Sequence, residues 1–245
     1  MNLKIISLAD RPDILSRPDD FRDAWPEFMY HDLVSSLFYD QVVTAYPEHC
    51  LVAVDQDGPV ARAFSFPLHW SADPDEVLPA GHDAVIVRAV QDRLAGRSGT
   101  LVALVEMTVR TDRRGAGLSM LMLDAVREQT AKLGYRSLVA PVRPTGKPDH
   151  PDIPLGEYVG WTRPDGLPVD PWLRVHIRAG GRVVGLAPHS TTISGTLAEW
   201  RSWTGLPFDT SGPVRVPGAL VPVHCDVRHG FGVYVEPNVW VHHRV

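Results

Sequence analysis

The chain has 245 residues, of which 44% are hydrophobic and 22% charged, and these values are typical of a globular protein with a sizeable core. Its net charge of −5 and its lack of Lys/Arg clusters argue against nucleic-acid binding, and no apolar run approaches the roughly 20 residues of a membrane helix. The start of the chain lacks a signal-peptide pattern, and Cys50 and Cys225 stand far apart, so we expect reduced thiols, a cytoplasmic location and no membrane partner.

The first hundred residues predict a strand, a helical region and a hairpin. Residues 3–8 have the character of a strand, and we expect a helix to begin after Asp19 or Asp20 and to run to about residue 45. Residues 51–54 and 60–66 are strand-like runs joined by a turn, which is typical of a β-hairpin. Residues 71–83 are polar, and residues 84–94 predict a further helix.

A strand at residues 101–109 leads into a glycine-containing turn at residues 114–119, and the apolar spacing after it predicts a helix to Lys132. Such a turn brings unpaired helix amides and the positive end of the helix together, which favours an anion. The glycines also let the backbone approach a phosphate without a Cβ in the way. The turn is not a Walker loop, because the chain has no Gly-x4-Gly-Lys-Ser/Thr run. It is not a dinucleotide fingerprint either, because Met120 stands at the last glycine position of that pattern.

The remainder of the chain begins with a short buried strand at residues 137–140. Residues 141–171 contain eight prolines and four glycines, and we expect a long functional loop there. Asp170 has the character of an N-cap for a helix that ends near residue 180, followed by a strand at 182–187. From residue 188 onward, the pattern predicts more strands and one small helix.

This order of elements resembles the GNAT superfamily of N-acetyltransferases over residues 1–187, with residues 71–100 as an insertion. Residues 114–119 are similar to the family signature Arg/Gln-x-x-Gly-x-Gly/Ala, with a serine at the last position. The resemblance implies an α/β (α+β) GNAT fold, in which a mixed central sheet is flanked by helices. We expect residues 188–245 to be a β-rich C-terminal extension packed on this core.

The resemblance also implies a ligand and a set of contacts. Acetyl-coenzyme A is the expected co-substrate, and the turn is expected to hold its pyrophosphate. The backbone at Val109 and Arg110 is expected to offer an amide to the thioester carbonyl. The histidines of the chain have no metal-ligand spacing, so we expect no metal. The residues expected to bind the co-substrate are Val109, Arg114, Gly115, Ala116, Gly117, Leu118 and Ser119.

Glu106 is the candidate general base. Strand alternation places it on one face with Thr108, whereas Val105, Met107 and Val109 take the other face. A carboxylate in so apolar a strand is costly unless it is solvated, paired or used. Members of the similar family place a glutamate near this position, where it deprotonates the amine, often through water. The alternative is an ordinary glutamate in a salt bridge or at a sheet edge.

His176 is the candidate general acid. It stands four residues before Gly180, where the similar family usually has a tyrosine that protonates the coenzyme A thiolate, and Gly181 replaces the family's phenylalanine. Histidine donates a proton near neutral pH when its pKa is unperturbed. The alternative is a core histidine, because His176 shares a helix face with Trp172 and Ala179.

Together these features predict an acyl-coenzyme A-dependent N-acyltransferase, which moves acetyl from acetyl-coenzyme A to a primary amine of a small molecule. A non-catalytic sensor of acyl-coenzyme A, or a GNAT-like protein with O-acyl transfer or decarboxylase activity, is the alternative. The loop at 141–171 is expected to lie over the acceptor site, with Tyr158, Trp161 and Trp172 as candidate lining residues. A homodimer that pairs through the C-terminal part is an open option. The C-terminal part itself resembles, at residues 196–208 and 236–240, the acetyltransferase halves of bacterial GNAT–carbon-nitrogen hydrolase fusions.

Overall fold

The computed structural model describes residues 3–15, 18–76 and 80–245. Its centre is a mixed sheet in which all neighbouring strands run antiparallel except β4 and β5. The predicted fold class is confirmed. The sheet order is β1 (Lys4–Ser7), β2 (Cys50–Asp55), β3 (Gly58–Leu68), β4 (Leu101–Val109), β5 (Ser137–Val142), β9 (Phe231–Arg244), β8 (Val223–Asp226) and β7 (Gly212–Val214), with β6 (Arg182–Thr196) paired to β9.

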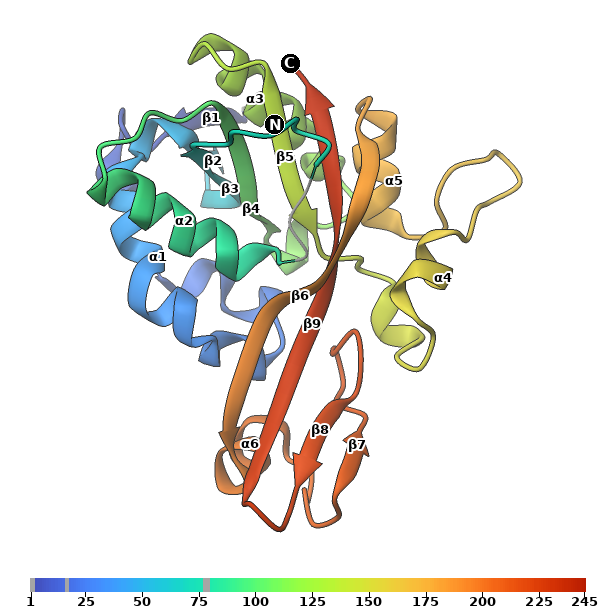
Figure 1. Cartoon of the computed structure of the whole chain (residues 1–245). Coiled ribbons are helices and arrows are strands. Elements are labelled where there is room, and N and C mark those ends of the chain that lie inside the picture. The colour runs from blue at the N-terminus through green and yellow to red at the C-terminus, as the bar shows by residue number, and fades with distance from the viewer. Residues whose placement is uncertain (1–2, 16–17, 77–79) are drawn as a thin grey trace.

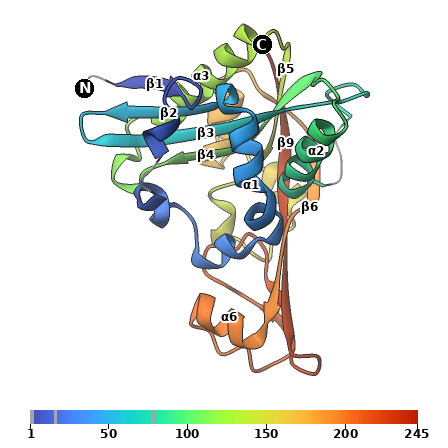
Figure 2. The same cartoon turned by 90° about the vertical axis from the view of Figure 1, so that its left-hand side faces the viewer.

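Helices cover both faces of this sheet (Figure 1). Helices α1 (Leu33–Ala45) and α2 (His82–Leu94) lie on one face, as Figure 2 shows, and α3 (Leu118–Lys132) and α5 (Pro171–Arg178) lie on the other. Each face has its own hydrophobic cluster, so the sheet is buried on both sides. Among the described residues, no helix combines the length and the apolar character needed to cross a bilayer.

The N-terminal elements confirm the predicted strand and hairpin but correct the predicted helix. Asp19 and Asp20 lie within a 3₁₀ helix, Pro18–Ala24, and a second 3₁₀ helix follows at Glu27–His31. The α-helix begins only after Asp32, whose carboxylate accepts hydrogen bonds from the first free amides of α1. Pro26 separates the two 3₁₀ helices, because a proline cannot continue a helix interior.

The C-terminal part is joined to the core more closely than an appendage would be. The expected boundary at residue 187 falls inside β6, and β9 lies in the central sheet beside β5. Beyond the core, β6 and β9 continue as a long ribbon that carries α6 (Leu197–Thr204), β7 and β8 (Figure 1). This outer part has its own hydrophobic cluster around Trp200 and Tyr234.

Strands β4 and β5 diverge, and this divergence positions the site. They pair only at Val102–Leu138 and Ala103–Val139, whereas β5 stays paired to β9 through Val142. On its other edge β4 remains paired to β3, with a β-bulge next to Glu106. The sheet therefore opens between the C-terminal halves of β4 and β5.

Candidate active site

A cavity of about 810 Å³ lies at this opening. Its walls come from the second half of β4, the end of β5, the N-terminal half of α1, the start of α5 and the middle of β9. Both candidate catalytic residues, Glu106 and His176, line it, and so do Val109, Arg114 and Ser119 from the expected co-substrate site. Residues 70 positions apart in the chain thus meet in one space.

The glycine turn has the shape expected of an anion cradle. Gly115 and Gly117 adopt left-handed backbone angles, with φ of 80° and 77°, which only glycine adopts at little cost. Among the described residues, a Cβ built on either glycine meets no atom within 4 Å, so the space at both Cβ positions is open. No side chain caps α3, which begins at Leu118, and its first amides are therefore available to a phosphate.

Arg114 is the arginine near this turn whose charge is available to bind an anion. Arg110 pairs with Asp112, and Arg113 pairs with Asp55 and Asp57. Arg114 instead donates to the carbonyl of Ala24 at 3.3 Å, and within the described part of the chain no ion pair engages it. Because Arg114 also lines the cavity, its charge lies at the rim between the turn and the interior.

One expected main-chain donor is already used. The amide of Arg110 donates to the carbonyl of Val60 at 3.0 Å within the sheet, so it is not free for a thioester oxygen. Successive amides of a strand point to opposite edges, and the amide of Val109 therefore points towards the opening between β4 and β5. The expectation for Arg110 is wrong, and Val109 remains the candidate donor.

Glu106 is buried and held by three donors. Its Oε1 accepts from Arg62 Nε at 2.5 Å and from Thr108 Oγ1 at 2.8 Å, and its Oε2 accepts from the Tyr39 hydroxyl. Burial lowers the pKa of Arg62, but the carboxylate outweighs it and the net pKa is raised. Burial and the same carboxylate raise the pKa of Tyr39 well above its ordinary value, so Tyr39 stays protonated. Glu106 is thus both salt-bridged and part of the cavity wall.

The bulge in β4 changes the predicted alternation at one position. Met107 and Val109 pack against the cluster on the α3 face, as predicted for the face opposite Glu106. Val105 packs instead with the cluster beneath α1 and α2, on the side where Tyr39 reaches Glu106. A bulge inserts one residue into the alternation, and this places Val105 and Glu106 on the same side.

His176 lies at the back of the cavity with 1% of its surface exposed. Its Nδ1 is 2.9 Å from Nε2 of His243, and its Nε2 has no hydrogen-bond partner among the described residues. The ring also contacts Trp172 edge to face, with centroids 4.4 Å apart. Burial, followed by the neighbouring His243, lowers the pKa of His176 well below its ordinary value. The pKa of His176 is thus not the unperturbed value considered from the sequence, and its role as general acid stays a prediction.

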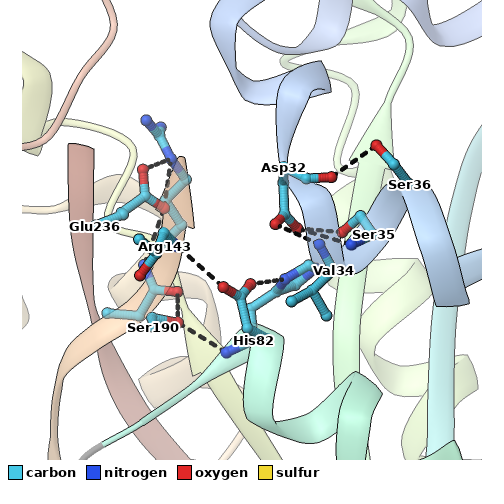
Figure 3. A network of polar contacts seen from close by, with 11 residues as sticks. Asp32, Val34, Ser35, Ser36, His82, Arg143, Ser190 and Glu236 are labelled. Carbon is cyan, nitrogen blue, oxygen red and sulfur yellow. Dashed lines mark hydrogen bonds and ion pairs between the residues drawn. The ribbon is translucent and has the colours of Figure 1, made fainter. Parts of the chain in front are cut away.

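A second charged pair, Arg143 and Glu236, which the sequence analysis missed, also lines the cavity, and Figure 3 shows the two side chains in contact. Arg143 Nε donates to Glu236 at 2.9 Å, and its Nη2 donates to the carbonyl of Gly218. The carboxylate of Glu236 also accepts from the Tyr234 hydroxyl at 2.7 Å and from Asn238 Nδ2 at 3.2 Å. Burial lowers the pKa of Arg143, but the carboxylate of Glu236 raises this pKa by more than burial lowers it, so the net pKa is raised.

The pair is continued by a chain of polar contacts toward α1 and α2. Asn238 Oδ1 accepts from Ser190 Oγ, which in turn accepts from the amide of His82 at 2.8 Å. His82 and Asp32 lie close together in Figure 3, with ligand atoms within 4.8 Å of each other. Burial lowers the pKa of His82, but Asp83 and Asp32 raise it above its ordinary value overall. These residues come from four distant segments, and the only local signal was an acid, Glu236, within an apolar strand.

Asp32, His82 and Asp83 are the described residues with the closest approach to a metal-ligand set, because their ligand atoms lie within 4.8 Å of one another. Both acids already have other hydrogen bonds. Asp32 caps α1 through Val34 and Ser35, and Asp83 accepts from the amide of Thr192. The expectation of no metal stays a prediction.

The loop at 141–171 is only partly a wall of the site. Its ends line the cavity at Thr145 and Pro171, and Trp172, just beyond the loop, also lines it. Tyr158 and Trp161 instead pack against each other with centroids 5.2 Å apart. The Tyr158 hydroxyl donates to Asp170, and the middle of the loop forms α4 (Leu155–Val159). Figure 1 shows α4 standing away from the sheet opening, so the expectation that the loop covers the site is wrong for its middle.

Comparison with known proteins gives one close curated relative and a set of structural neighbours. The chain is 32% identical over 270 residues to "Arginine N-acetyltransferase avaD" of Aspergillus versicolor, and the match covers 97% of this chain and 92% of the relative. No protein-family model matches the chain.

Two of the matching solved structures illustrate the shared fold. One is the loading GNATL domain of CurA from Lyngbya majuscula, at 17% identity and a TM-score of 0.60, covering 99% of this chain and 96% of that one. The other is the GphF GNAT-like decarboxylase in complex with isobutyryl-CoA, at 18% identity and a TM-score of 0.56, covering 100% and 99%. At these identities the likeness concerns the fold alone.

Proposed function

The chain belongs to the GNAT superfamily of N-acetyltransferases, and on that premise we propose that it transfers an acetyl group from acetyl-coenzyme A to a primary amine of a small molecule. The observation that carries the proposal is the glycine turn with open space at both glycines, whose flanking residues Arg114 and Ser119 line the cavity between β4 and β5. A turn without this cavity would suit any anion. The combination suits a ligand with a phosphate group and a reactive end.

The residues of the turn fit the phosphate part of acetyl-coenzyme A. Uncapped amides at the start of α3 and the left-handed Gly115 and Gly117 supply main-chain donors, and Arg114 supplies a cation at the rim. In this proposal, Ala116, Leu118 and Ser119 contribute through their backbone. Farther in, the amide of Val109 is the donor for the thioester oxygen. When bound, acetyl-coenzyme A supplies the activated acyl group.

Glu106 and His176 are the proposed proton-transfer groups. An amine arrives mainly as an ammonium ion, and Glu106 draws off its first proton through water, while Arg62 and Tyr39 keep the carboxylate in place. His176 delivers a proton to the departing sulphur, because its unpartnered Nε2 is the ring nitrogen left for an incoming group.

We propose arginine, or a related amino acid with a cationic side chain, as the first acceptor to test. The relative's name supports this choice, and the cavity supports it through charge. Asp32, Asp40 and Glu236 bring three carboxylates to the cavity wall, which favours a cation. Arg143 and His82 also line the cavity and offer donors for a carboxylate.

The test measures thiol release from acetyl-coenzyme A with a panel of arginine, lysine, agmatine and an arylalkylamine. Mass spectrometry of the product then locates the acetyl group. We expect arginine or a close analogue to give an N-acetyl product. Tight binding of coenzyme A with no turnover on any amine would instead indicate an acyl-coenzyme A sensor and refute the proposal.

A further inference from the structure

His176 and His243 form a buried pair of imidazoles that the proposed chemistry only half uses. His176 projects from α5 and His243 from β9, each with 1% of its surface exposed, and Nδ1 of the first is 2.9 Å from Nε2 of the second. Burial lowers the pKa of His243 to about 4, and the pKa of His176 lies well below its ordinary value. Both rings are therefore neutral at neutral pH.

The backbone is shaped to let this pair form. A Cβ on Gly181 would lie 2.5 Å from Cε1 of His243 and 2.7 Å from the carbonyl of His176, closer than any real Cβ contact. Glycine is thus required where the end of α5 passes over β9, and a phenylalanine at this position would displace the ring of His243. The pair and Gly181 form one packing unit.

A neutral pair has two proton arrangements. In the first, His243 donates from Nε2 to Nδ1 of His176, and His176 carries its own proton on Nε2. In the second, His176 donates from Nδ1 to Nε2 of His243, and Nε2 of His176 is a free lone pair. The distance is the same in both arrangements, but the nitrogen offered to the cavity is a donor in one and an acceptor in the other.

Only the second arrangement can complete the transfer without leaving a charge behind. In the first, a neutral His176 that gave its Nε2 proton to sulphur would become an anion, which a buried apolar position strongly disfavours. In the second, Nε2 first accepts a proton and then gives it away, so that the ring returns to its starting state. A neutral buried histidine acts as an acid only after it has acted as a base.

We propose that His243 is a positioning residue that holds His176 with its proton on Nδ1, so that His176 carries one proton from the acceptor nitrogen to the departing sulphur. This inference rests on the proposed function. The nitrogen–carbon bond forms and the carbon–sulphur bond breaks, with its electron pair staying on sulphur. Nε2 of His176 takes the second proton of the original ammonium group and passes it to that sulphur. The first proton leaves through Glu106 to water.

The groups around the pair are consistent with a neutral shuttle. Arg127 on α3 and His242 on β9 both lower the pKa of His243, and Trp172 covers one side of His176. Within the described part of the chain, no carboxylate is in hydrogen-bond or ion-pair contact with either ring. The transient positive charge on His176 is therefore shared with His243 rather than with an acid.

The tautomer itself is the first test, and it needs no turnover. Two-bond proton–nitrogen correlation spectra of the ¹⁵N-histidine-labelled full-length protein distinguish the Nδ1–H form, the Nε2–H form and the imidazolium. We expect His176 in the Nδ1–H form and His243 with its proton on Nδ1, both neutral at neutral pH. His176→Gln and His243→Gln spectra assign the signals. A His176 signal of the Nε2–H form would overturn the proposal.

The second test separates positioning from packing. His243→Gln keeps an oxygen acceptor near the place of Nε2, whereas His243→Leu removes it, and His242→Gln on the opposite face of the same strand is the matched control. We expect His243→Leu to lower kcat by roughly 10- to 100-fold, with KM for both substrates nearly unchanged. We expect His243→Gln to recover most of this loss and His242→Gln to stay near wild type.

Non-additivity gives the last readout. If His243 acts through His176, the double variant His176→Gln/His243→Leu should be no slower than His176→Gln alone. Additive losses, or a His243→Leu enzyme with full kcat, would refute the positioning role while acetyl transfer by the wild type still stood. Failure of the proposed function looks different, because the wild type itself would then transfer acetyl to no amine.

Discussion

Replacing Gly117 with alanine tests the anion cradle most directly. Gly117 has a φ of 77°, and an L-residue pays about 1–2 kcal/mol to adopt left-handed angles. The added Cβ meets no atom within 4 Å, so the cost is backbone strain and not a clash. Since the turn is exposed, its backbone can change conformation in the free variant at little cost in free energy. The strain then makes the free energy of binding less favourable, because a bound ligand requires the original left-handed conformation.

The expected result is a weaker affinity for coenzyme A. A cost of about 1–2 kcal/mol corresponds to a roughly 5- to 30-fold rise in Kd. Isothermal titration calorimetry measures this Kd, and denaturant unfolding should report little change in stability. Gly117→Val should have a larger effect, because a β-branched side chain tolerates these angles less well.

Gly96 provides the matched control. It also has a positive φ, of 63°, and open space around its Cβ position, but it follows the end of α2 and does not line the cavity. Gly96→Ala should therefore leave the Kd for coenzyme A unchanged. If Gly117→Ala binds within twofold of wild type, or if Gly96→Ala loses as much affinity, the main-chain cradle does not hold the ligand.

Three further outcomes are expected. Arg114→Ala should raise the Kd for coenzyme A about fivefold at low salt and less at high salt. Arg113→Ala should change the Kd little, because the Arg113 side chain is already paired with Asp55 and Asp57. Calorimetry at two ionic strengths checks both variants. Glu106→Gln should lower kcat by roughly 10²–10⁴ with coenzyme A binding intact, and full turnover in a thiol-release assay would remove Glu106 from the role of base. Burial lowers the pKa of His49 and of His243 to about 4. Between pH 6.5 and 4, these two histidines therefore bind protons in the unfolded chain but not in the folded protein. The unfolding free energy should therefore decrease as the pH is lowered from 6.5 to 4, by up to about 3 kcal/mol for each ring. Denaturant titrations at several pH values measure this slope, and a His49→Gln variant with an unchanged slope would contradict the reasoning.

The features that could be predicted from the sequence are those that the local chain determines. The turn at 114–119 is set by two glycines between an apolar strand and an amphipathic helix, and all of these signals lie within about 30 residues. The start of α5 is similar, because Asp170 and Pro171 specify a capped helix end by themselves. Local hydrogen bonding and backbone preference decide such features before any tertiary contact forms.

The features that could not be predicted depend on which distant segments meet. Arg62 and Tyr39 reach Glu106 from a strand and a helix more than 40 residues away, and nothing in residues 101–109 indicates such partners. The bulge beside Glu106 also has no residue signature, and it moved Val105 to the other face. The neutral state of His176 likewise follows from burial against His243, which is 67 residues away.

The divergence of β4 and β5 ties the C-terminal strand to catalysis. Strand β5 pairs with β4 at two positions but with β9 at six, so most of its hydrogen bonding lies on the edge away from β4. Because β9 keeps the other edge of β5 paired, β5 stays in the sheet after it leaves β4, and its edge facing β4 beyond Val139 opens to the cavity. Strand β9 also supplies His243 behind His176, and Glu236 and Asn238 at the cavity wall. The opening between β4 and β5, the contact of His243 with His176, and the cavity wall at Glu236 therefore all depend on β9. A substitution that shifts β9 by one residue would exchange the faces of His242 and His243 and disturb all three features at once.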